Sequence, residues 1–307
     1  MKTSMIMQLV SIATLAVACG AQAQTINITV GSGLANVATV YRESTVMAEA
    51  YRKYVQENGT KLSGKEARAL RGKLRGATVA HMRYQPPGNR PEILIHARSG
   101  RSIEGTIEQL TGAGGGAGGG SGSSTEAGEA VSPSEQARDV GEARYYPADT
   151  PTSIRAVNLE RKAGWVVQPY PGEDGRVIHG GDAELKALRN LESRLAGNPA
   201  LQGGRLTGYV SKTVCESCTR AFADFAETYG VSGNVYHLDE TTVNGVAVSP
   251  GQRWSGTLRR MRAANVDTVL SDEVLEAGSM DWWSTPFEAA RVAAAEAGVL
   301  AIPAACN

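Results

Sequence analysis

The sequence predicts an α/β protein, in which a mixed sheet is flanked by helices, preceded by a smaller α+β N-terminal domain. Strand-like and helix-like segments alternate in the order β-β-α-β-α-β between residues 164 and 238, and this alternation predicts helices packed on a sheet. A glycine- and serine-rich run over residues 112–124 has the composition of a flexible linker. We therefore expect three parts after an N-terminal leader: residues 24–111, 112–143 and 144–307.

The first residues have the pattern of an export signal. Lys2 precedes a mostly apolar run, and Ala21-Gln22-Ala23 is an A-x-A cleavage site. We expect residues 1–23 to be a signal peptide and the mature chain to be periplasmic or secreted. Lipidation at Cys19 is the alternative. No later run approaches the ~18 apolar residues of a membrane span, so we expect no transmembrane segment in the mature chain.

The N-terminal domain is expected to contain two helices, a turn and a short strand. Apolar residues recur at helical spacing over residues 41–57. Ser63-Gly64-Lys65-Glu66 has the capping-box pattern and begins a basic helix. A turn at residues 86–89 then precedes a short strand at residues 92–96. Over the whole chain Lys+Arg and Asp+Glu both total 31, so the net charge indicates no class of partner.

The second domain has its predicted core at residues 150–245, followed by a helical extension. Gly197 and Gly230 end the two helices of this core. The predicted strands are residues 164–168, 176–179, 205–210 and 234–238, and the predicted helices are 182–196 and 215–229. Beyond them we expect helices at 258–264 and 286–297 and an edge strand at 267–270.

An acidic residue interrupts the apolar face of the first core helix. Glu184 lies on the same face as Leu188, Leu191 and Leu195, which follow it at helical spacing. A buried carboxylate is costly unless it is paired or functional. Acids in a first turn also suit the helix dipole, which explains Asp182 and explains Glu184 only if its side chain turns outward.

The second core helix begins with two cysteines. Cys215 and Cys218 are spaced so that both lie over the aromatic face formed by Phe222, Phe225 and Tyr229. A helix N-terminus lowers the pKa of a thiol and favours the thiolate, which is the form that binds zinc. If residues 1–23 are removed, three cysteines remain, and an odd number excludes complete disulfide pairing within one chain.

Together the two helix starts predict a zinc site. Asp182, Cys215 and Cys218 would supply three protein ligands and leave a fourth position open, which is typical of catalytic zinc. Glu184 would stand beside the metal as a general acid and base, taking a proton from the attacking water and passing it on. His179 is the alternative ligand or a substrate contact.

Substrate contacts follow from position alone. Trp165 and Thr213 flank the predicted site and could contact the nucleobase of a substrate, although a tryptophan at this position also suits the core. Trp282-Trp283 could stack on an exposed base or form a packed corner.

These motifs resemble the nucleic-acid and nucleotide (cytidine) deaminase superfamily. The run from Asp182 through Glu184 and the later Cys215-Glu216-Ser217-Cys218 are similar to the D-x-E and CxxC motifs of its bacterial toxin-type members, among them the Xanthomonas-type deaminase family. The resemblance implies a cytidine-deaminase-like three-layer fold, a zinc ion held by Asp182, Cys215 and Cys218, and Glu184 as proton shuttle. Two residues depart from the usual pattern: Val214 stands where Pro is common, and Asp182 where His is common.

The leading functional hypothesis is a secreted zinc-dependent deaminase that acts as a toxin or effector. It would convert cytosine to uracil in nucleic acid or nucleotides, and its producer would need a cognate immunity protein. One alternative is an envelope thiol–disulfide protein that uses Cys215 and Cys218. The other is a binding module that zinc or a disulfide stabilises and that has no catalytic activity.

Overall fold

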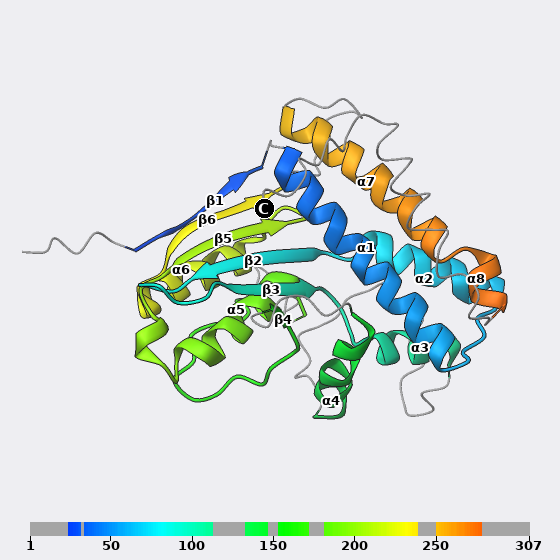
Figure 1. Cartoon of the computed structure of the whole chain (residues 1–307), viewed down its shortest axis with the longest axis horizontal. Coiled ribbons are helices and arrows are strands. Elements are labelled where there is room, and N and C mark those ends of the chain that lie inside the picture. The colour runs from blue at the N-terminus through cyan, green and yellow to red at the C-terminus, as the bar shows by residue number, and fades with distance from the viewer. Residues whose placement is uncertain are drawn as a thin grey trace, which may run out of the picture.

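A single six-stranded sheet organises the protein, and its strands come from both halves of the chain (Figure 1). The computed structural model describes residues 24–31, 34–112, 133–146, 153–171, 181–238 and 250–277. In order across the sheet the strands are β1 (Ile26–Val30), β6 (Ser232–His237), β5 (Arg205–Val210), β2 (Val79–Gln85), β3 (Ile93–Arg98) and β4 (Ser153–Arg155). β2 runs antiparallel to both of its neighbours and the other pairs are parallel. The predicted α/β class with a mixed sheet is confirmed.

The predicted division into an N-terminal domain and a second domain is wrong. β2, from residues 24–111, lies between β5 and β3, and β1 pairs with β6. Removal of either part would therefore break backbone hydrogen bonds in the middle of the sheet. The two halves fold as one unit around this sheet, so every experiment below uses the whole chain after residue 23.

The last part of the predicted linker at residues 112–143 is a helix. α4 (Pro133–Gly141) is a helix that is tied to the rest of the protein. Arg138 donates two hydrogen bonds to Glu108, at 2.7 and 3.0 Å. The buried Asp139 carboxylate accepts from the backbone and side-chain amides of Asn158, at 2.9 and 2.8 Å. Residues 113–132 of the predicted linker lie outside the described part.

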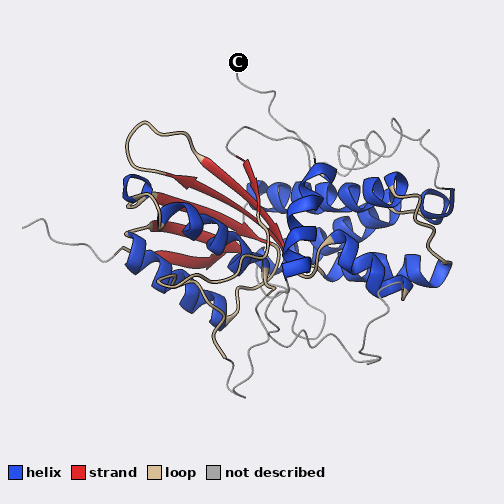
Figure 2. Cartoon of the chain, turned by 90° about the horizontal axis from the view of Figure 1, so that it is seen from below, coloured by secondary structure: helices blue, strands red, loops and turns tan. Residues whose placement is uncertain are grey.

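Helices cover both faces of the sheet, and Figure 2 shows the strands between two groups of helices. α5 (Ala183–Leu195) and α6 (Glu216–Tyr229) share one core cluster with inward-facing residues of β2, β3, β5 and β6. A second cluster joins the helices of the other side, which are α1 (Leu34–Glu57), α2 (Gly64–Gly76), α3 (Ile103–Thr111), α7 (Pro250–Val269) and α8 (Asp272–Ala277). None of these helices has the length and apolar composition needed to cross a membrane.

Local sequence signals explain how several helices begin and end. Ser63 and Glu66 form the predicted capping box of α2, which satisfies two backbone donors of its first turn. Gly230 ends α6 in the left-handed conformation, with φ of 65°, as expected of a C-terminal glycine. Two short 3-10 helices, Glu142–Tyr145 and Pro199–Leu201, complete the described elements.

Two predicted strands are wrong. Residues 164–168 form no strand, because the backbone N–H groups of Val166 and Val167 donate to the side chain of Glu192 instead of to a neighbouring strand. Residues 267–270 belong to the last turn of α7 and the residue after it. The predicted strand at 176–179 and the helix at 286–297 lie outside the described residues, as do the export signal at 1–23 and Trp282-Trp283.

Gly233 allows β5 and β6 to approach closely. It has φ of 156°, and a Cβ atom there would lie 1.8 Å from the carbonyl oxygen of Leu206, its partner in the parallel ladder. This oxygen is backbone and cannot move away. We expect Gly233→Ala to lower the free energy of unfolding by about 1–3 kcal/mol or more, measured by urea denaturation.

Gly72→Ala is the matched control for this substitution. Gly72 lies on the exposed side of α2, and a Cβ atom there would have no other atom within 4 Å. Alanine at this position is therefore expected to stabilise the helix by about 0.5–1 kcal/mol. Equal stability of the two variants would contradict the strand register.

Candidate metal centre

The N-termini of α5 and α6 meet on one side of the sheet. The two helices pack through Leu188, Leu191, Phe222 and Phe225, which are all fully buried in one core cluster. Apolar residues at helical spacing turn these faces inward. Because α5 and α6 share this core, their first residues, Asp182 and the CxxC cysteines, come together.

Asp182 and Cys215 are the N-cap residues of α5 and α6. The side chain of Asp182 makes no capping hydrogen bond. Its Oδ2 instead lies 3.7 Å from Sγ of Cys215 and 3.5 Å from Sγ of Cys218. Both cysteines are free thiols, and the backbone N–H of Cys218 donates to Sγ of Cys215 at 3.4 Å. The carboxylate is thus directed to the sulfurs and not to its own helix.

These separations fit a shared metal ion. Zinc binds sulfur at about 2.3 Å and carboxylate oxygen at about 2.0–2.2 Å with tetrahedral angles, which places the two kinds of ligand atom ~3.6 Å apart. The observed distances of 3.7 and 3.5 Å match this value. The three side chains therefore form a group that could hold a metal ion.

Glu184 lies in the first turn of α5, where only 3% of its surface is exposed. That burial excludes the alternative in which the side chain turns outward and only complements the helix dipole. Burial, together with the nearby negative charges of Asp182 and Cys215, raises the pKa of Glu184 to about 8, while its own backbone N–H and Lys212 act in the opposite direction. Glu184 is thus a protonatable carboxyl within the electrostatic reach of the sulfur site.

The acidic groups of the site disfavour one another's ionised forms. The pKa of the Cys218 thiol lies far above its usual range because of its hydrogen bond with Cys215, its burial and the nearby Glu184 and Asp182. Several acidic groups converging in a buried position are stabilised as anions by a bound cation. The electrostatics therefore support the same conclusion as the distances.

The other predicted site residues are placed differently. Thr213 is exposed in the loop between β5 and α6, two residues before Cys215, as expected for a residue that flanks the site. Trp165 is buried beside the far part of α5, where the next residue bonds to Glu192, roughly 12 Å along the helix axis from Glu184. It is therefore far from the sulfur group. His179 lies outside the described residues.

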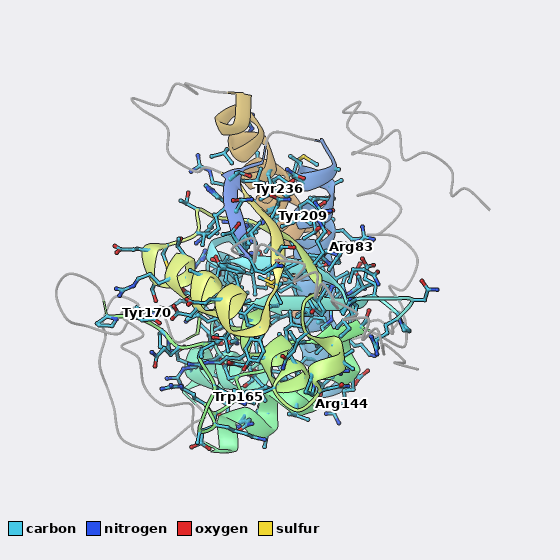
Figure 3. The ribbon with its side chains drawn as sticks, turned by 90° about the vertical axis from the view of Figure 1, so that its left-hand side faces the viewer. Arg83, Arg144, Trp165, Tyr170, Tyr209 and Tyr236 are labelled. Atoms are coloured by element: carbon cyan, nitrogen blue, oxygen red, sulfur yellow. The ribbon has the colours of Figure 1, made fainter. Side chains whose placement is uncertain are left out.

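Tyr170 approaches the sulfur group more closely than Trp165, and Figure 3 shows the two side chains well apart. The backbone N–H of Tyr170 donates to Oγ of Ser217, which lies between the two cysteines, at 2.8 Å. The guanidinium of Arg220 stacks 4.4 Å from the centre of the Tyr170 ring. Tyr170 is not among the predicted site residues, because no local pattern links it to α6.

A second group of potential metal ligands was also missed. Glu43, His81 and His96 come together in the interior, on the other face of the sheet. A signal for the histidine pair exists in the sequence. The predicted turn at 86–89 folds the chain back, with residue 81 five positions before it and residue 96 seven positions after it, and the observed register pairs these two residues. Glu43 comes from α1, and no local pattern predicts its approach.

Searches for related proteins found no match among protein-family models, curated proteins or solved structures. The resemblance to deaminases therefore rests on the residues of this chain alone.

Proposed function

We propose that this protein is a zinc-dependent deaminase that converts cytosine to uracil in nucleic acid or nucleotides. The observation that carries the proposal is the convergence of Asp182 with Cys215 and Cys218, at 3.7 and 3.5 Å between ligand atoms, beside the buried Glu184. The mixed sheet with helices on both faces agrees with a cytidine-deaminase-like three-layer fold, which is part of the proposal.

Asp182, Cys215 and Cys218 would hold the zinc ion and leave one position open. Zinc bound there would supply a Lewis acid that makes water acidic enough to act as a nucleophile at neutral pH. Two thiolates and an aspartate give the site a net charge of minus one, whereas a neutral histidine in place of Asp182 would give zero. The more negative set makes the water less acidic, so the reaction depends more strongly on a general base.

Glu184 would move the protons. Its carboxylate takes a proton from the attacking water as the water oxygen bonds to C4 of cytosine, and delivers that proton to ring N3. The C4–N bond then breaks, and Glu184 transfers the remaining hydroxyl proton to the amino group, which leaves as ammonia. The products are uracil and ammonia, and Glu184 returns to its starting state.

Part of the proposed site is exposed to solvent. Cys215 and Asp182 are half-buried and Thr213 is exposed, whereas Cys218 and Glu184 are buried. A nucleobase that approaches from the exposed side would pass Thr213 and Cys215 before it reaches the buried Glu184. Such a depth suits single-stranded or flipped-out nucleotides, because a base stacked in a duplex cannot reach a recessed group.

The proposed biological setting rests on the expected export signal at residues 1–23. We propose that the mature chain acts outside its producer's cytoplasm as a toxin or effector. The reason is that an exported deaminase finds no obvious pool of nucleotides in the periplasm of its producer. The producer would then need an immunity protein that binds near the exposed side of the site.

The test is a substrate panel with the purified chain after residue 23. Single-stranded DNA, duplex DNA, RNA and cytidine nucleotides are incubated with the zinc-loaded protein. Sequencing of the polymers and mass spectrometry of the nucleotides then record cytosine-to-uracil changes and ammonia release. Conversion in at least one substrate class is expected. No conversion in any class, with zinc bound at the cysteines, would leave a non-catalytic binding module.

A thiol–disulfide role makes a different prediction for the same cysteines. A redox role needs Cys215 and Cys218 to form a disulfide that exchanges with other thiols, whereas a metal site holds both as thiolates. Quantification of free thiols in air-exposed, zinc-loaded protein separates the two roles. The deaminase proposal expects both thiols to be held by metal, and a disulfide that exchanges with dithiothreitol supports the redox role.

A further inference from the structure

We propose that Glu43, His81 and His96 form a second metal site, which binds a divalent first-row transition-metal ion. The site lies on the face of the sheet that α1 covers. Ala80 and Met82, the neighbours of His81 along β2, belong to the core on the opposite face, with α5 and α6. The two metal sites are thus separated by the sheet, and this proposal does not depend on the deaminase function.

The ligand atoms already have the spacing that such an ion requires. Oε1 of Glu43 lies 2.9 Å from Nδ1 of His96 and 3.1 Å from Nδ1 of His81, and the two nitrogens are 3.4 Å apart. Metal bonds of about 2.0–2.1 Å place neighbouring ligand atoms ~2.9 Å apart in an octahedral site and ~3.3 Å apart in a tetrahedral one. All three separations lie close to this range.

The three ligand residues of this triangle come from three elements, which are β2, β3 and α1. His81 and His96 are directly opposite each other in the antiparallel pair of β2 and β3, so their side chains leave the sheet on the same face. Glu43 lies on the buried stripe of α1, between Val40 and Met47 at helical spacing. Each of the three ligand residues is buried, at 4% relative exposure, and a carboxylate in such a place needs positive partners.

Arg155 orients the carboxylate of Glu43. Arg155, the partner of His96 in the parallel pair of β3 and β4, places Nη1 3.5 Å from Oε2 of Glu43. Oε1 faces the histidines, so Arg155 acts on the oxygen that is not the proposed ligand. An outer partner of this kind fixes a ligand carboxylate in place. Arg42 is 3.9 Å from Oε1 but is largely exposed, and such a contact contributes little.

A cavity adjoins the triangle. It is lined in part by Glu43, His96, Arg98, Tyr146 and Arg155. Three protein ligands beside an open space are typical of sites where the metal keeps exchangeable positions, as opposed to closed structural sites with four protein ligands. Two imidazoles and one carboxylate suit zinc, iron, cobalt or nickel, whereas magnesium and calcium prefer oxygen ligands.

The experiment is a cobalt(II) titration of the metal-free whole chain after residue 23, followed by absorption spectroscopy. We expect two equivalents to bind. One gives the intense near-ultraviolet bands of cobalt bound to thiolate, and the other gives only weak visible bands of a nitrogen and oxygen site. The double variant Cys215→Ser/Cys218→Ser should then keep one equivalent, without the thiolate bands. A wild-type chain that binds a single, thiolate-bound equivalent overturns the proposal.

Substitutions at Glu43, His81 or His96 test whether the second cobalt ion binds at these residues. In the double cysteine variant, His96→Gln should weaken cobalt binding by more than the roughly 10–100-fold that loss of an outer-shell partner causes. Tyr209→Phe is the matched control, because Tyr209 is the neighbour of His81 in β5 and supplies no ligand. Cobalt retained equally in both variants overturns the assignment to this triangle.

If His96→Gln does not fold, thermal unfolding of the double cysteine variant with and without cobalt tests the same site. Cobalt should raise the melting temperature of the double cysteine variant, because an ion that binds only the native state stabilises it. No rise means that Glu43 accepts hydrogen bonds from the two histidines without a metal, which overturns the proposal. The readout is binding and not deamination, so an inactive enzyme leaves the result intact.

Discussion

Glu184→Gln is expected to abolish cytosine deamination while the protein stays folded and keeps its zinc. Glutamine has nearly the same shape, but it cannot accept a proton from water or pass one to the base. General acid–base catalysis contributes about 10²–10⁴-fold to a rate. In the proposed mechanism Glu184 alone performs all the proton transfers. We therefore expect turnover to fall by about 10³-fold or more, measured by sequencing of the best substrate.

The same substitution should not lower stability. Glu184 is 3% exposed and its pKa is raised, first by burial, so its charged form is unfavourable in the folded protein. A neutral amide removes that penalty, which predicts an unfolding midpoint equal to or above that of the wild type. Loss of activity with retained or increased stability is characteristic of a functional residue.

Glu216→Gln is the matched control. Glu216 is an exposed acid in the first turn of α6, so the pair compares the same chemical change at two helix starts. We expect wild-type activity from Glu216→Gln. Activity retained by Glu184→Gln, or lost equally in both variants, would remove Glu184 from its proposed role.

Cys218→Ser is expected to release zinc from the sulfur site and to destabilise the protein. Cys218 is fully buried and its sulfur lies 3.5 Å from Oδ2 of Asp182, so serine removes a thiolate ligand without adding bulk. Zinc at a free concentration about 1,000 times its dissociation constant stabilises a folded protein by about 4 kcal/mol. The variant should lose most of this contribution, measured as a lower unfolding midpoint in the presence of zinc.

A chelator separates metal loss from a packing defect. Treatment of the wild type with a strong zinc chelator should lower its midpoint towards that of Cys218→Ser, whereas the variant should change much less. Thr219→Ala serves as the control, since Thr219 is exposed, follows Cys218 and supplies no ligand. A Cys218→Ser protein with the zinc content and chelator response of the wild type would contradict the ligand assignment.

Local patterns predicted the elements that carry the proposed active site. α5, β5, α6 and β6 lie close to their predicted positions, because apolar periodicity and end signals such as Gly230 act within a few residues. The approach of Asp182 to the two cysteines also followed from these patterns. Two helices that pack side by side on one face of a sheet and run in the same direction have their first turns at the same end.

Long-range pairing was not predictable in the same way. Nothing in residues 79–85 indicates that they lie between β3 and β5, since strand order depends on contacts between distant segments. The glycine-rich run suggested a domain boundary, yet it falls between parts of one sheet. The false strand at residues 164–168 has a comparable cause, because the buried carboxylate of Glu192 accepts the N–H groups that a strand would use.

The most direct test of the account is X-ray diffraction at the zinc absorption edge from crystals of the zinc-loaded chain. We expect an anomalous peak between the Asp182 carboxylate and the sulfurs of Cys215 and Cys218, at about 2.3 Å from each sulfur. A structure with no peak at this position, or with Cys215 and Cys218 joined in a disulfide, would contradict it.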